Sequence, residues 1–435
     1  MTYKKNFDLP PVSSRCDALT MKKETIFIQI ASYRDPQLGL TIKDCLEQAD
    51  DAERLRFGIC WQKDDSEQLS YTDDDRFRIE EVPFKESKGV CWARNSVQQL
   101  YQGEDYTFQL DSHHRFVKGW DTILIDMLKD LQSKGHEKPL LTTYAPSFDP
   151  ENDPGARVQE PWEMTFDRFI PEGAVFFLPR GIPNWRNLSE PVPARFYSAH
   201  FAFTVGKFAE EVQHDPEYYF HGEEISIAVR AYTHGYDLFH PHKVVAWHEY
   251  TRKGRTKQWD DDKTWGEKNS KSHSKNRSLF GMDGQDMPEE MRFGKYGFGK
   301  VRTLRDYEKY SGLHFGKRAV QQHTLDLKYP PNPAPEDDAE WEKTLTSRFK
   351  HCIDVGFGSV PEQDYDFWCV AFKDKNGEDI YRKDADQAEI ERMKKDPDGY
   401  CKVWREFQTD KKPHSWLVWP HSRSKGWCDQ VTGTL

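Results

Sequence analysis

Two segments of the sequence combine side chains that can hold a divalent metal ion. The apolar run 106–110 ends abruptly in Asp111-Ser112-His113, which puts a carboxylate and an imidazole on the same side of a turn, at a spacing suited to chelating one ion. Further along, the run 244–247 ends in His248, which can supply a third ligand. An aspartate that caps the next helix beside solvated histidines is the structural alternative for the first segment. The combination of both segments favours the metal site.

A pair of acidic side chains comes directly before a predicted helix. Glu223 and Glu224 are followed by Ile225, Ala228 and Val229, whose spacing puts them on the inward face of that helix. Two carboxylates in the first turn also complement the helix dipole, and this purely structural role is the alternative. The pair is therefore a candidate for the same crevice as the metal ligands.

The segments around these residues alternate between strand and helix patterns. β-Branched and aromatic runs predict strands, and apolar residues at helical spacing predict helices. The predicted order is strand 25–31, helix 37–49, strand 56–62, strand 77–82, helix 91–101 and strand 106–110. This alternation predicts an α/β fold with a mostly parallel sheet and helices on both faces. We expect the apolar run before His248 to end a strand of the same parallel sheet, so that His248 converges with Asp111. Ligands bind at the carboxyl ends of the strands in such sheets, so the loops after residues 31, 62 and 110 should line one crevice.

Length and charge exclude several classes of function. The 435 residues suffice for two or three domains, and the 14 Trp, 19 Tyr and 27 Phe indicate an ordered globular protein. Because 73 acidic side chains outnumber 62 basic ones, we expect no nucleic-acid partner and no anionic membrane surface. No uncharged apolar run approaches the ~20 residues that span a bilayer. The first 23 residues contain no apolar signal segment, so a cytoplasmic location is expected.

The composition changes at a proline-rich, acidic stretch that begins at Tyr329. Such stretches are typical of semi-rigid linkers, and the short β-prone runs after it are separated by turn signals such as Lys375-Asn376-Gly377. We predict four parts. They are an N-terminal tail over residues 1–23, a catalytic domain over 24–328, the linker over 329–342 and a small β-rich accessory domain over 343–435.

Four motifs follow one another in a specific order along the predicted catalytic domain. They are Ile30-Ala31-Ser32-Tyr33-Arg34-Asp35-Pro36, Gly89-Val90-Cys91-Trp92-Ala93-Arg94, Gln109-Leu110-Asp111-Ser112-His113-His114-Arg115-Phe116 and His221-Gly222-Glu223-Glu224-Ile225-Ser226. Together with His248, they resemble metal-dependent retaining glycosyltransferases of the GT-A fold. The resemblance is closest to the UDP-GlcNAc:hydroxyproline-polypeptide GlcNAc-transferases, glycosyltransferase family 60. The polypeptide GalNAc-transferases are more distantly similar.

The resemblance implies a GT-A fold and a hexosyltransferase that moves a sugar, expected to be GlcNAc, from a UDP-sugar to a hydroxyl acceptor on a protein or a glycan. Asp111, His113 and His248 would hold Mn²⁺ or Mg²⁺, and the mixed nitrogen and oxygen ligands favour Mn²⁺. Glu223 and Glu224 match the site that binds the transferred sugar and orients the acceptor hydroxyl. The residues expected to bind the nucleotide sugar are Ser32, Tyr33, Arg34, Asp35, Arg94, Ser112 and His200.

Two other functions are compatible with the same sequence. A metal-dependent phosphoesterase, or nucleotide-sugar hydrolase, would use the three metal ligands to activate water. A non-catalytic carbohydrate-binding protein would stack sugars on aromatic side chains near the C-terminus, for which packing in a core is the commoner role. These side chains are Trp404, Trp416, Trp419 and Trp427. The basic segment 251–257, just after His248, is either a solvated turn or a lid over a diphosphate site.

Overall fold

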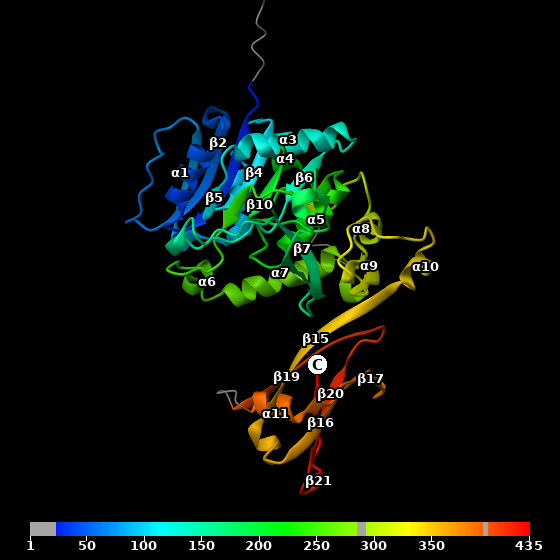
Figure 1. Ribbon diagram of the computed structural model, residues 1–435. Helices are drawn as coiled ribbons and strands as arrows, with labels where there is room; N and C mark the ends of the chain where they lie inside the picture. Colours follow the sequence, from blue (N-terminus) through cyan, green and yellow to red (C-terminus); the bar gives the residue numbers. More distant parts are fainter. Residues whose placement is uncertain (1–22, 285–292, 395–398) are drawn as a thin grey trace, which may run out of the picture.

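The computed structural model describes residues 23–284, 293–394 and 399–435, so nearly all of the predicted N-terminal tail lies outside the described residues. An α/β part fills the upper half of Figure 1, and a β-rich part, coloured orange to red, lies below it. Among the described residues, no helix combines the length and the apolar composition that crossing a membrane requires.

The α/β part is built on an eight-stranded sheet. Its strands, in spatial order, are β3 (Phe77–Pro83), β2 (Leu55–Lys63), β1 (Ile26–Tyr33), β4 (Tyr106–Asp111), β10 (Phe201–Val205), β6 (Pro139–Thr142), β11 (Asp237–His240) and β9 (Val192–Pro193). The strands β3, β2, β1 and β4 pair in parallel, and β6 pairs in parallel with β11. Strand β10 runs antiparallel to both β4 and β6, and β9 runs antiparallel to β11. The sheet is therefore mostly parallel, as the sequence predicts.

Helices cover both faces of this sheet, which explains why strand β1 carries apolar side chains on both of its faces. Ile26, Ile28 and Ile30 of β1 pack in one core cluster with residues of α1 and α3, whereas Phe27 packs in another cluster with Val97 of α2. The helices of the α/β part are α1 (Leu38–Gln48), α2 (Val90–Gln98), α3 (Trp120–Ser133), α4 (Phe208–Glu211), α5 (Glu223–Thr233), α6 (Gln258–Asp261), α7 (Trp265–Leu279), α8 (Leu304–Ser311) and α9 (Gln322–Leu325).

Two antiparallel strand pairs lie outside the main sheet. Strand β5 (His114–Phe116) pairs with β12 (Ala246–His248), so that His114 lies opposite His248. Strand β7 (Trp162–Phe169) pairs with β8 (Val175–Gly181). The sequence predicts that His248 ends a strand of the parallel sheet, and this detail is wrong. His248 reaches the site because β12 pairs with the strand that directly follows the Asp111 turn.

The β-rich part contains two sheets that pack on a shared apolar core. One includes β15 (Leu345–Gly356) and β19 (Tyr400–Thr409), which pair along ten residues each. The other comprises β16 (Tyr365–Lys373), β17 (Asp379–Arg382), β18 (Ala385–Asp386), β20 (Ser415–Ser422), β21 (Gly426–Trp427) and β22 (Val431–Thr434). Ile353, Trp368, Val403 and Val418 are buried between them, and α11 (Gln387–Met393) contributes Ile390. The predicted α/β class is confirmed: a mostly parallel sheet flanked by helices, with a small β-rich C-terminal part.

Strand β15 belongs to both halves of the molecule and forms the long connection visible in Figure 1. Its first two residues pair with β14 (Ala319–Gln321), which in turn pairs with β13 (Leu313–His314), and the rest of β15 pairs with β19. Just before it, α10 (Asp338–Glu342) buries Trp341 completely, and the ring stacks on His314 at 5.8 Å between centroids. The segment after the proline-rich stretch is thus packed against the α/β part.

Candidate active site

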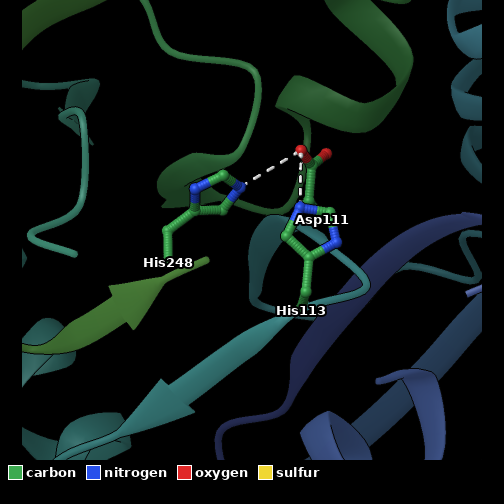
Figure 2. Close-up of side chains that lie close together, drawn as sticks. All are labelled: Asp111, His113 and His248. Atoms are coloured by element: carbon green, nitrogen blue, oxygen red, sulfur yellow. Dashed lines mark ion pairs between the residues drawn. The ribbon is translucent and has the colours of Figure 1, made fainter. Parts of the chain in front are cut away.

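Asp111, His113 and His248 come together at the carboxyl end of β4. Asp111 is the last residue of that strand, His113 lies in the turn that follows, and His248 ends β12. The Asp111 Oδ2 lies 3.7 Å from the His113 Nε2 and 3.5 Å from the His248 Nε2 (Figure 2). One ligand atom from each residue lies within 4.8 Å of the others. The structure therefore brings together all three predicted metal ligands.

The chemistry of these three side chains fits a divalent ion. His248 is 6 % exposed, yet neither of its ring nitrogens has a hydrogen-bond partner among the described residues. The His113 Nδ1 lies 2.7 Å from the Asp35 Oδ2, and a carboxylate there leaves the lone pair on Nε2, the nitrogen that faces Asp111. Such a carboxylate-histidine pair is a common support for a metal-bound imidazole. Two nitrogens and a carboxylate oxygen are suited to Mn²⁺.

Charges around the cluster keep its carboxylates ionised. Burial alone raises the pKa of Asp111, but the contact with His248 and the charge of Arg94 outweigh it and hold the pKa well below its usual range. The Arg94 guanidinium donates a 3.0 Å hydrogen bond to the Asp111 Oδ1. Burial also raises the pKa of Asp35, and His113 and Arg255 reverse this effect. Both carboxylates are thus anionic at neutral pH.

A first pocket opens on the side of His113. Tyr33, Asp35 and Ser112 line it from the α/β core, and Arg252 and residues 255–259 line it from the segment after His248. Two sets of contacts hold this segment against the α/β core. Arg255 pairs with Asp35 at 3.1 Å, and Asp261, which follows the pocket-lining residues, accepts hydrogen bonds from Tyr33 at 2.7 Å and from Arg34 at 2.9 Å. Part of the basic segment after His248 therefore lines this pocket.

A second pocket opens on the side of His248 and contains the two predicted glutamates. Gly222 adopts a φ of 95°, which favours glycine, and the chain then enters α5 with Glu223 and Glu224 as its first residues. Glu224 accepts hydrogen bonds from the Tyr144 hydroxyl and the Ala199 backbone N–H, both at 3.0 Å. The Glu223 Oε1 lies 3.5 Å from the Arg94 guanidinium. Burial, followed by the neighbouring Glu224, raises the pKa of Glu223 to about 8.

The two pockets meet at the metal-ligand cluster. Asp111, His248, Tyr250, Phe220 and Arg252 line both of them. A molecule that extends from one pocket into the other must therefore pass Asp111 and His248.

The residues predicted to bind the nucleotide sugar are divided between these pockets. Tyr33, Asp35 and Ser112 line the first, whereas Arg94 and His200 line the second. The other two do not line either pocket. Ser32 is completely buried, and Arg34 lies over the Phe84 ring and pairs with Asp261.

Sequence reasoning missed Tyr144 and Tyr250, although both contact predicted residues. The Tyr250 hydroxyl donates to the Ala145 carbonyl at 2.8 Å, and its ring lies 4.3 Å from that of His248. Tyr250 follows His248 by two residues, which is the one local signal that could have drawn attention to it. Tyr144 follows β6 and has no comparable signal in the sequence.

Comparisons with known proteins identify the family. The family model described as Glycosyltransferase (GlcNAc) matches residues 25–76 and 69–317, which together make up more than half of the chain. The chain belongs to this glycosyltransferase family. No curated protein sequence matches it significantly.

Two solved structures that resemble the chain share little of its sequence. A crystal structure of GalNAc-T7 with UDP, GalNAc and Mn²⁺ is 11 % identical, with a TM-score of 0.48 over 95 % of this chain and 72 % of that one. Residues 1–349 of S. aureus TarS in complex with UDP-GlcNAc are 10 % identical, with a TM-score of 0.37 over 65 % of this chain and 72 % of that one.

Proposed function

We propose that this glycosyltransferase is metal-dependent and moves a sugar, expected to be GlcNAc, from a UDP-sugar to a hydroxyl group of a protein or a glycan. The observation that carries the proposal is the meeting of two pockets at Asp111 and His248. A nucleotide sugar joins its two halves through a diphosphate. The proposal places the diphosphate at the metal-ligand cluster, the nucleoside in the first pocket and the sugar in the second.

Asp111, His113 and His248 would hold the ion, with Mn²⁺ expected before Mg²⁺. When bound, the ion would neutralise the charge that develops on the diphosphate as the sugar leaves. The chain also supplies cationic side chains on the nucleotide side. Arg252, Arg255 and Lys257 line the first pocket, where they are suited to binding phosphate oxygens.

The two glutamates have different surroundings, which supports different roles. Both oxygens of Glu224 already accept hydrogen bonds, so we assign this residue to holding the wall of the sugar pocket. A carboxyl with a pKa of about 8 is mostly protonated at neutral pH, and Glu223 can then donate a hydrogen bond to the sugar or the acceptor. In a retaining reaction the acceptor attacks from the side that the leaving group departs from. A donor phosphate oxygen can take its proton, and no strong protein base is needed.

The C-terminal part is proposed to serve the acceptor. All residues assigned to the metal ion, the nucleotide or the sugar precede residue 262, and the β-rich part carries the exposed aromatic side chains Trp404 and Trp427. The hydroxyproline-polypeptide specificity of family 60, the cytoplasmic location and the boundaries at residues 328 and 342 stay predictions.

The test is a panel of nucleotide sugars incubated with the full chain and Mn²⁺, with release of UDP measured in the absence of acceptor. We expect UDP from one donor, UDP-GlcNAc before the others, and none in excess EDTA. Release of a nucleoside monophosphate instead would identify the phosphoesterase. Glycan binding without turnover, unchanged by EDTA and by Asp111→Ala, would identify the non-catalytic alternative.

A further inference from the structure

Three aromatic rings form a continuous stack between the sugar pocket and the metal-ligand cluster. The imidazole of His200 lies on that of His248, with ring centroids 4.1 Å apart and planes inclined by 20°. The Tyr144 ring stacks on His200 at 5.3 Å and 24°, and its hydroxyl binds Glu224. His200 therefore contacts both a metal ligand and the residue that holds the sugar-pocket glutamate.

His200 is itself fixed by hydrogen bonds at both ring nitrogens. The Ala145 backbone N–H donates to its Nε2 at 3.1 Å, so this nitrogen carries no proton. The proton resides on Nδ1, which lies 3.2 Å from the Ser198 hydroxyl oxygen and donates to it. The side chain is 7 % exposed. Its ring is thus held by the backbone and by the preceding turn.

The two metal-ligating histidines are supported in different ways. The ring of His113 is oriented by the hydrogen bond from its Nδ1 to Asp35. His248 lacks such a bond, since neither of its nitrogens has a hydrogen-bond partner among the described residues. Partners that orient a ligating imidazole contribute strongly to metal affinity. For His248, this orientation has to come from packing, and of the rings that contact it, His200 is the nearest and the most nearly parallel.

We propose that His200 is a positioning residue that holds the imidazole of His248 by stacking, so that its Nε2 faces Asp111. The inference rests on the proposed function only in taking Asp111, His113 and His248 as ligands of one ion. It assigns to His200 a role through the metal ligand, in place of the direct contact with the nucleotide sugar that the sequence resemblance implies.

The test measures the affinity of the full chain for Mn²⁺ without donor, by electron paramagnetic resonance of the free ion. We expect His200→Leu, which fills the space without a flat ring, to weaken Mn²⁺ binding roughly tenfold or more. His200→Phe keeps a ring and should bind within about threefold of the wild type, because stacking is retained. The matched control is His240→Leu. His240 is also buried and hydrogen-bonded to backbone atoms, but it lines neither of the two pockets, so Mn²⁺ affinity should not change.

Two results would overturn different parts of the account. If folded His200→Leu binds Mn²⁺ as tightly as the wild type, while Asp111→Ala does not bind it, the positioning role is wrong and the metal site stands. If Asp111→Ala binds Mn²⁺ like the wild type, the ligand assignment behind the proposed function is wrong.

A milder variant keeps the test decisive if His200→Leu does not fold. Ser198→Ala removes the acceptor of the Nδ1 proton and leaves the ring in place. The electron spin-echo signal of bound Mn²⁺ should show nitrogen couplings from two imidazoles in the wild type and a weakened second coupling in Ser198→Ala. Identical couplings and identical Mn²⁺ affinity in the two proteins would contradict the proposal.

Discussion

The two parts of the molecule bury very different side chains. In the α/β part, Arg94, Asp35, Glu223 and His248 are all less than 10 % exposed and lie around one point at the end of β4. In the β-rich part the core is apolar, and a buried charge such as Arg405 has a local partner in Glu389. Burying several charges is costly unless they are paired, and a cluster of them is typical of a site that performs chemistry. The contrast supports the proposal that the chemistry takes place in the α/β part, whereas the β-rich part presents exposed aromatic side chains.

The largest effect is expected at Asp111. Asp111→Ala removes the oxygen that both histidines face, so turnover of the UDP-sugar should fall at least ~10²-fold because Lewis-acid stabilisation is lost. UDP release under saturating Mn²⁺ checks this, with His240→Leu, a buried residue outside both pockets, as the control. Activity within a few-fold of the wild type would break the assignment of chemistry to this cluster.

Truncation tests whether the two parts can be separated. A chain that ends at Leu327 lacks Trp341, which is fully buried, and its loss should destabilise the α/β part by about 3–5 kcal/mol. A chain that ends at Arg348 keeps Trp341 and the pairing of β15 with β14. We expect the longer chain to release UDP slowly and to lose transfer to the acceptor. Urea unfolding and UDP binding of both chains provide the measurement. A folded longer chain that does not bind UDP would show that the β-rich part completes the site.

The buried Glu223 should make stability depend on pH. In the folded protein it keeps its proton up to about pH 8, whereas in the unfolded chain it loses the proton near the ordinary value of 4.5. Between these values the folded state binds more protons, so the free energy of unfolding falls as the pH rises. Because Glu223→Gln does not titrate, its free energy of unfolding should change less with pH. Across the range measured, the change should be smaller than in the wild type by roughly 1 kcal/mol or more. Thermal melts in EDTA from about pH 5 to pH 9 provide the comparison. Parallel curves for the two proteins would refute the raised pKa.

The smallest effect on stability is expected at Trp404. Its side chain is 58 % exposed, so Trp404→Ala should change the free energy of unfolding by no more than about 0.5 kcal/mol and leave UDP release unchanged. Transfer to the acceptor should slow if this surface binds it. The matched control is Trp368→Ala, where a fully buried ring is lost at a cost of about 3–5 kcal/mol. Unchanged transfer by Trp404→Ala would remove this residue from the acceptor surface.

Local patterns in the sequence predicted the parts of the site that depend on a single element. The end of β4 at Asp111 and the start of α5 at Glu223 follow from apolar periodicity on one side of each residue. The antiparallel insertion of β10 and the pairing of β5 with β12 join segments far apart in the sequence, and no local pattern encodes them. The same holds for the contact of Asp35 with His113 and for the packing of Tyr144 on His200, which arise only when distant loops converge.

The most direct test of the central claim is the release of UDP from UDP-GlcNAc by the full chain with Mn²⁺, compared with the same sample in excess EDTA and with Asp111→Ala. The account predicts release that depends on metal, stops in EDTA and is nearly absent in the variant. Release that continues unchanged in EDTA and in Asp111→Ala would contradict it.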